Sequence, residues 1–143
     1  MLQQAASITL SRALRQAGRR EICGFLLVDS AGAQEIFLVR NSSWNVGGFT
    51  IAALDAERME RYAERHGYRV HALIHSHWST LELSDVDKHG LATSKLPWLV
   101  VMLDGDSIRY RLYDPASRDQ PANTKMNSRS SSLTNDPQWT DKP

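Results

Sequence analysis

The sequence predicts an α+β domain in which helices flank a mixed β-sheet. Two pairs of strand-like segments, 22–29 with 35–40 and 98–103 with 108–113, are each separated by a few turn-forming residues, a spacing typical of β-hairpins. A further apolar segment at 69–77 has strand composition and stands between two predicted helices. The order along the chain is therefore helix, hairpin, helix, strand, helix, hairpin.

Three segments are predicted to be helices, residues 4–17, 53–66 and 84–94. The first two carry apolar side chains at helical intervals, which are Ile8, Leu10, Ala13 and Leu14, and then Leu54, Met59, Tyr62 and Ala63. Each of these two is followed by a glycine, Gly18 or Gly67, that can end a helix. The third segment is short and begins with a serine and two aspartates, which favour a helix N-terminus.

The chain divides into a domain and a polar tail. Its length of 143 residues, 41% of them hydrophobic, suffices for one domain with a core. After residue 113 the sequence is dominated by Ser, Asn, Asp, Thr and Pro and has no apolar periodicity. Such a segment cannot bury enough apolar surface to offset its ordering entropy. We therefore expect a compact domain at 1–113 and a disordered tail at 114–143.

The composition argues against several classes of function. A formal net charge of +1, with no run of Lys or Arg, gives no support for nucleic-acid binding. The single cysteine, Cys23, excludes an internal disulfide and the Cys-x-x-Cys ligand pair of a zinc-dependent deaminase. The N-terminal segment lacks the pattern of a signal peptide, and no apolar run approaches the ~18 residues of a membrane span. A cytoplasmic protein that binds no membrane is expected.

The densest group of potential metal ligands is the stretch HALIHSHWSTLELSDVDKHG, residues 71–90. Since residues two apart in a strand point to the same face, His75 and His77 would project together at the end of this strand. Ser84 and Asp87 lie three apart at a helix start, so their side chains are close on its first turn. If the intervening loop folds back over the strand end, Asp87 completes a set of two histidines and one carboxylate.

Two interpretations of this stretch are open on these residues alone. Three protein ligands and one open coordination position are the pattern of a catalytic zinc site, whereas structural zinc sites have four protein ligands. Alternatively, the His-x-His pair is only a polar strand end, and Ser84 with Asp87 forms an N-terminal capping box. His71 would share the strand face of His75 at about 13 Å, given a rise of ~3.3 Å per residue, and would pack in the core or at an edge.

Taken together, the spacings resemble the metal motif of the JAMM (MPN+, Mov34/JAB) metallopeptidases. The five motif residues are Glu21, His75, His77, Ser84 and Asp87. The flanking segments match as well: EICGFLL around the glutamate, Asn41 after the second strand, a short FTI, and LPWLVVML after the aspartate helix. The resemblance covers roughly residues 5–113. It implies a cytidine-deaminase-like JAMM/MPN fold with a partly curved sheet, of a prokaryotic or phage type.

The resemblance implies a metallopeptidase that hydrolyses an amide or isopeptide bond, with a protein or peptide as its substrate. The C-terminal tail of a ubiquitin-like or sulfur-carrier protein is the substrate that the family suggests. Zn²⁺ would be held by His75, His77 and Asp87. Glu21 would serve as the general base, and Ser84 would donate a hydrogen bond to the oxyanion.

One position departs from the family, which usually has proline after the second histidine. Trp78 occupies it here, and we expect this side chain to contact the substrate. The alternative from another functional class is a non-catalytic MPN-type scaffold or a phage tail assembly component. Such a scaffold would need none of the five motif residues.

Overall fold

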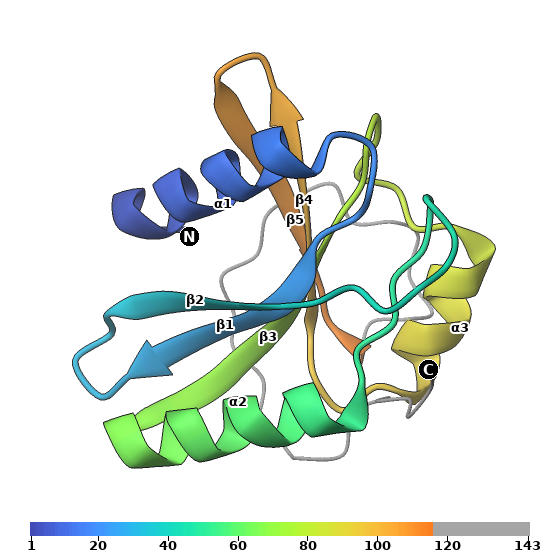
Figure 1. Cartoon of the computed structure of the whole chain (residues 1–143). Coiled ribbons are helices and arrows are strands. Elements are labelled where there is room, and N and C mark those ends of the chain that lie inside the picture. The colour runs from blue at the N-terminus through green and yellow to red at the C-terminus, as the bar shows by residue number, and fades with distance from the viewer. Residues whose placement is uncertain (116–143) are drawn as a thin grey trace.

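The structure is a computed structural model and describes residues 1–115. These residues contain a five-stranded mixed sheet with the order β2-β1-β3-β4-β5 (Figure 1). The strands are β1 (Cys23–Asp29), β2 (Gln34–Val39), β3 (Tyr68–Ser76), β4 (Trp98–Asp104) and β5 (Ser107–Tyr113). Neighbouring strands are antiparallel except β3 and β4, which are parallel. The predicted mixed sheet and its two hairpins are confirmed.

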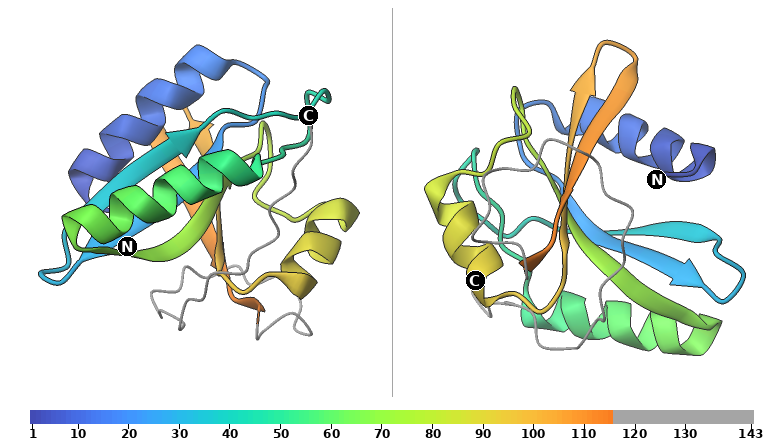
Figure 2. Two further views of the ribbon diagram at one scale, coloured as in Figure 1. Left: turned by 60° about the horizontal axis from the view of Figure 1, so that its bottom comes forward. Right: turned by 180° about the vertical axis from the view of Figure 1, so that it is seen from behind.

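Helices cover both faces of the sheet, and their bounds are α1 (Gln4–Ala17), α2 (Ala53–His66) and α3 (Asp85–Thr93). α1 packs on one face through Leu10 and Leu14. α2 and α3 lie against the other face, as Figures 1 and 2 show. Each face has its own cluster of buried apolar side chains, so the sheet separates two hydrophobic layers.

The helices bury narrower stripes than their apolar residues predict. The buried stripes are Ala6, Leu10 and Leu14 in α1 and Ala56, Met59 and Ala63 in α2. Ile8 and Leu54, two of the apolar residues from which the helices are predicted, lie outside these stripes, with exposed fractions of 48% and 54%. Each lies two residues from a buried position, about 200° around a helix of 3.6 residues per turn. Gly67 ends α2 as predicted, with a φ of 76° that glycine adopts without strain.

A β-bulge interrupts β3 at His71. The pairing register between β1 and β3 shifts here and leaves His71 as an extra residue. Strict alternation of faces breaks at this point, and Val70 and Leu73, three residues apart, both pack in the cluster under α2. The expectation that His71 and His75 share a face of the strand assumed that side chains alternate between the two faces all along β3. The bulge interrupts this alternation between the two residues.

The described part of the chain contains no helix that is long and apolar enough to cross a membrane. β5 ends at Tyr113, the last residue of the predicted domain. The tail at 114–143 lies outside the described residues from position 116 onward, so its disorder stays a prediction.

Candidate metal centre

Two separate segments of the chain meet at the end of β3. β1 and β3 are antiparallel, and β1 begins opposite His75. Two hydrogen bonds extend this pairing beyond β1, from Ser76 N to the Ile22 carbonyl at 3.0 Å and from Ile22 N to Ser76 Oγ at 2.8 Å. The residue before Ile22 is Glu21, which is thereby brought beside His75 and His77.

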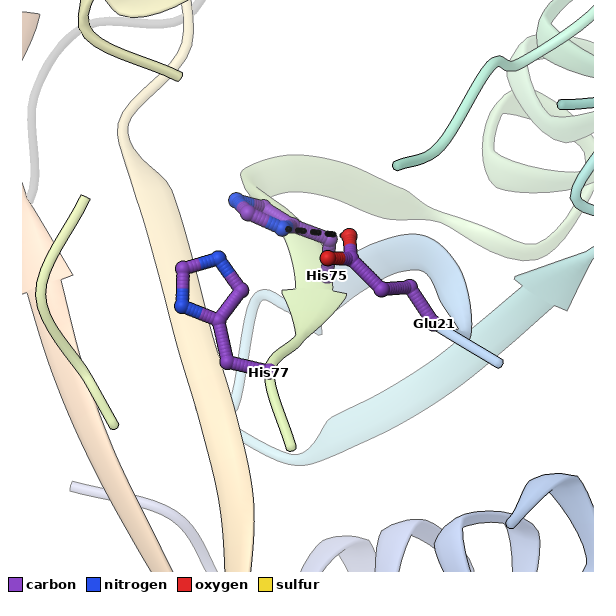
Figure 3. A group of neighbouring side chains, drawn as sticks. All are labelled: Glu21, His75 and His77. Atoms are coloured by element: carbon purple, nitrogen blue, oxygen red, sulfur yellow. Dashed lines mark ion pairs between the residues drawn. The ribbon is translucent and has the colours of Figure 1, made fainter. Parts of the chain in front are cut away.

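Glu21, His75 and His77 form a compact group of potential metal ligands (Figure 3). One ligand atom from each residue lies within 4.8 Å of the other two. Oε1 of Glu21 is 3.5 Å from Nδ1 of His75, whose side chain is fully buried. Imidazole nitrogens and carboxylate oxygens are ordinary ligands of divalent metals, so these three residues could bind a metal ion.

Several polar atoms of this group lack a hydrogen-bond partner. Oε1 of Glu21 and both ring nitrogens of His75 are buried and unpaired within residues 1–115. At 3.5 Å, Glu21 Oε1 and His75 Nδ1 are close enough for an electrostatic interaction, but they do not meet the geometric criteria of a hydrogen bond. Buried polar atoms without partners are rare and cost stability. A cation would supply a partner for Glu21 Oε1 and for one ring nitrogen of His75, and a carboxylate with two imidazoles is a donor set that fits zinc.

His77 is oriented by contacts to both of its ring nitrogens. Nδ1 lies 3.1 Å from the Thr80 carbonyl oxygen, and Nε2 lies 3.0 Å from Oδ2 of Asp87. Because a carbonyl oxygen can only accept a hydrogen bond, Nδ1 must carry a proton. Nε2 then has two possible states. It either carries a second proton and donates a hydrogen bond to Asp87, or it offers its lone pair to a cation. Burial lowers the pKa of His77, but the hydrogen bond to Asp87 and the negative charges of Asp87 and Glu21 outweigh it, so this pKa is raised.

Asp87 approaches the group from the first turn of α3. Ser84 caps this helix, because its Oγ accepts a hydrogen bond from Asp87 N at 3.0 Å and its own N–H donates to Asp87 Oδ2 at 3.1 Å. This reciprocal pair is the capping box that the sequence allows. Burial raises the pKa of Asp87, but the hydrogen bond from His77 and the charge of His75 lower it overall. The capping and metal-site interpretations are compatible, because the same serine fixes the carboxylate beside His77.

The motif residues lie in one region but differ in their distance from its centre. Asp87 contacts His77 and is not part of the compact group that Glu21 and His75 form with His77. The Ser84 side chain is exposed, and since its Oγ is the acceptor in the cap, its own proton is free for another bond. Glu21 lies as near to the histidines as a ligand would. The assignment of Asp87 as third ligand and Glu21 as base therefore stays a prediction.

Two aromatic rings hold the buried His75. Phe49 stacks on it with 4.4 Å between ring centroids, and Trp98 meets it edge to face at 5.2 Å. Phe49 belongs to the FTI segment, which is a loop. Asn41 anchors this loop, since its side-chain amide donates to the Glu21 carbonyl at 2.8 Å and three further hydrogen bonds join it to the loop backbone. Asn41 thus connects the loop that carries Phe49 to the backbone of Glu21.

The loop before α3 is held by two residues that the sequence analysis missed. The Tyr113 hydroxyl donates to the Leu81 carbonyl at 2.8 Å. Nη1 of Arg111 contacts the Glu82 carboxylate at 3.2 Å and the Tyr113 hydroxyl at 3.0 Å. No sequence pattern separates the buried Arg111 from the exposed Arg109 two positions earlier, because only the fold brings β5 beside this loop.

Two further residues lie next to the group. Trp78 is 57% exposed and lines a cavity together with Glu21 and His77. Its contact with substrate stays a prediction. Cys23 is fully buried, and burial followed by the charge of Glu21 raises the pKa of its thiol to about 12. The thiol therefore stays protonated and serves as a core side chain.

No protein-family model and no curated protein matches the sequence. Solved structures do match the fold. Protein DSY2949 from Desulfitobacterium hafniense aligns with a TM-score of 0.65 and 18% identity, over 76% of this chain and 79% of that one. AF2198, a JAB1/MPN domain protein from Archaeoglobus fulgidus, aligns with a TM-score of 0.50 and 16% identity, over 88% of this chain and 89% of that one. The fold is similar to that of an MPN domain. At these identities the likeness concerns the fold alone.

Proposed function

We propose that the protein is a zinc-dependent hydrolase of amide or isopeptide bonds. The observation that carries this proposal is the set of buried, unpaired ligating atoms on Glu21 and His75, with His77 beside them. A protein that served only as a scaffold would gain nothing from burying these atoms without partners, because each costs stability. The similarity to an MPN-domain structure agrees with the proposal at the level of fold.

The residues of the group have complementary roles in this proposal. His75, His77 and Asp87 would hold zinc, which when bound supplies a Lewis acid and a water whose pKa is around 7. Glu21 would accept a proton from the attacking water and deliver it to the leaving amine. Ser84 would donate its free hydroxyl proton to the substrate carbonyl oxygen as negative charge develops there.

The proposed substrate is an extended chain end, such as the C-terminal tail of a ubiquitin-like or sulfur-carrier protein. Glu21 and His77 are reached from the surface through a cavity of about 280 Å³. A space of this size accommodates a narrow peptide segment but not a folded surface. We therefore propose a protein partner with a flexible end, and neither nucleic acid nor membrane.

Metal analysis followed by a cleavage screen tests the proposal. Zinc would be measured on the purified full-length chain before and after chelation, and cleavage would be followed by mass spectrometry on fusions with a Gly-Gly tail. We expect about one zinc per chain, with cleavage that is lost on chelation and restored by zinc. A chain that takes up no metal would end the metal-site proposal. A zinc-loaded chain that cleaves none of the fusions would favour a scaffold or a phage tail assembly component.

A further inference from the structure

A cavity lies beside the ligand group, between the C-terminal end of α1 and the end of β3. Its volume is about 280 Å³. Glu21 and His77 form its wall toward the ligand group, and Leu14 contributes an apolar side. Arg19, Arg20 and Trp78 line the cavity as well. The proposed hydrolase uses only the Glu21 and His77 wall, which leaves the chemistry of the Arg19 and Trp78 wall to be explained.

Arg19 presents a guanidinium whose charge is not neutralised. Its Cζ lies over the Trp78 ring, 5.1 Å from the centroid. Within residues 1–115 it has no carboxylate partner in a salt bridge. The neighbouring Arg20 differs, because its guanidinium donates to the backbone carbonyls of Asn41 at 3.3 Å and Ser43 at 3.0 Å. Arg20 is therefore tied to the loop after β2 through its Nη2, whereas the Arg19 guanidinium makes no hydrogen bond within residues 1–115.

The contact with Trp78 gives this free guanidinium a defined place. An arginine over an indole face is held by cation–π attraction while the edges of its planar fork stay open to a further partner. That fork matches a carboxylate, which it binds through two parallel hydrogen bonds. Glu21 is the one carboxylate that lines the cavity among the described residues, and it approaches His75. The Arg19 wall is thus positive and without an internal counter-charge.

We propose that the cavity binds a carboxylate of the substrate at the wall formed by Arg19 and Trp78. This inference rests on the proposed function and narrows its substrate class to amides with a carboxylate close to the scissile bond. The carboxylate belongs either to an acidic side chain or to the free C-terminus of the chain that leaves. Leu14 and Leu103 would contact the apolar part of the same residue.

Binding of three short peptides to the full-length chain tests this site. The probes are acetyl-Gly-Glu-amide, the neutral isostere acetyl-Gly-Gln-amide, and acetyl-Gly-Gln with a free C-terminus. The Trp78 indole N–H signal would be followed by NMR during titration, after assignment with Trp78→Phe. We expect at least one carboxylate probe to bind about tenfold more tightly than the neutral one, the gain typical of a hydrogen bond to a charged group. Which carboxylate probe shows the gain identifies the source.

Arginine variants decide whether Arg19 is responsible. Arg19→Gln should remove the preference, and Arg19→Lys should retain part of it, because lysine keeps the charge but loses the fork. Arg12→Gln is the matched control, since Arg12 lies on α1 outside this cavity and should leave the preference unchanged. Equal binding of all three probes, or a preference that survives Arg19→Gln, would overturn the proposal.

Cleavage of the Gly-Gly fusions, measured with the same protein preparations, separates this inference from the proposed function. A carboxylate preference without hydrolysis would support the binding site and count against the hydrolase. Hydrolysis of fusions without any carboxylate preference would do the reverse.

Discussion

The Tyr113 hydroxyl donates a hydrogen bond to the Leu81 carbonyl at 2.8 Å, across 32 positions of the chain. This bond ties the end of β5 to the loop between His77 and Asp87. The loop contains no proline that would stiffen its backbone, and it begins with Trp78. β5 therefore holds the loop at Leu81, in addition to the hydrogen bonds within the loop itself.

Tyr113→Phe should loosen this loop while keeping the aromatic ring in place. We expect a loss of about 2 kcal/mol in the free energy of unfolding, measured by urea titration, because the hydroxyl donates one hydrogen bond to Leu81 and accepts another from Arg111. Zinc affinity, measured by competition with a chelator, should fall as well because Asp87 is held less firmly. Tyr110→Phe is the control, since its hydroxyl contacts Leu2 N instead and should leave zinc affinity unchanged. Unaltered zinc affinity in Tyr113→Phe would show that the loop needs no such support.

Glu21→Gln and His75→Ala separate a base from a ligand. If Glu21 is the base, Glu21→Gln should keep its zinc and lose about 10²–10⁴-fold in rate, as general-base variants do. His75→Ala should lose zinc and activity together, because the remaining ligands hold the ion poorly. Zinc content and turnover would be measured on the same preparations. Loss of zinc from Glu21→Gln would instead make Glu21 a ligand, a role its 3.5 Å distance from His75 permits.

The contact between His77 and Asp87 predicts how the stability of the metal-free protein depends on pH. The pKa of His77 is raised above 6.5, so its contribution is complete below pH 6.5 and is lost as pH rises through the raised value. The pKa of Asp87 is lowered below 3.8, so its contribution is complete above pH 3.8 and is lost as pH falls through the lowered value. The pair should stabilise the metal-free protein most between pH 3.8 and pH 6.5.

Urea titrations of the metal-free protein from about pH 4 to pH 8 would measure this profile. His77→Gln should flatten it, since glutamine does not titrate, and a variant that keeps the wild-type profile would refute the assignment. Zinc affinity should move the other way, because the ion needs an unprotonated Nε2. It should rise with pH by up to about tenfold per pH unit below the raised His77 pKa.

Gly24→Ala should destabilise the hairpin next to the ligand group. A Cβ at Gly24 would lie 2.3 Å from the Phe37 carbonyl oxygen and 2.8 Å from the Leu38 Cα, so β1 and β2 would have to separate. We expect a loss of about 1–3 kcal/mol in the free energy of unfolding, measured by urea titration. Gly47→Ala is the control, because a Cβ there meets nothing within 4 Å. Equal stability of the two variants would contradict this account of Gly24.

The elements could be predicted because their signals are local. A glycine at position 67 and a capping serine at position 84 mark the end of one helix and the start of another, and neither signal depends on the rest of the fold. The exposure of Ile8 and Leu54 could not be predicted, since a stripe of apolar residues does not reveal which edge of it the sheet covers.

Some features of the candidate site could likewise be predicted from local patterns, and others could not. His75 and His77 share a strand end through the two-residue period, and Asp87 follows from the capping pattern. The aromatic ring stacked on His75 comes from a loop without a regular period, and the hold of Tyr113 on the preceding loop depends on strand order. Contacts of this kind join distant segments, and the sequence alone carries no local signal for them.

The place of β1 between β2 and β3 affects how the chain reaches its final form. β2 follows at once and pairs locally, whereas β3 joins the other edge only after α2 has been synthesised. Until then that edge of β1 is open, and open apolar edges promote aggregation of nascent chains. Glu21 and His75 meet through this same non-local pairing. Zinc added during refolding should therefore raise the yield of native protein without speeding its formation. The reason is that zinc binds only chains in which β3 has already paired with β1.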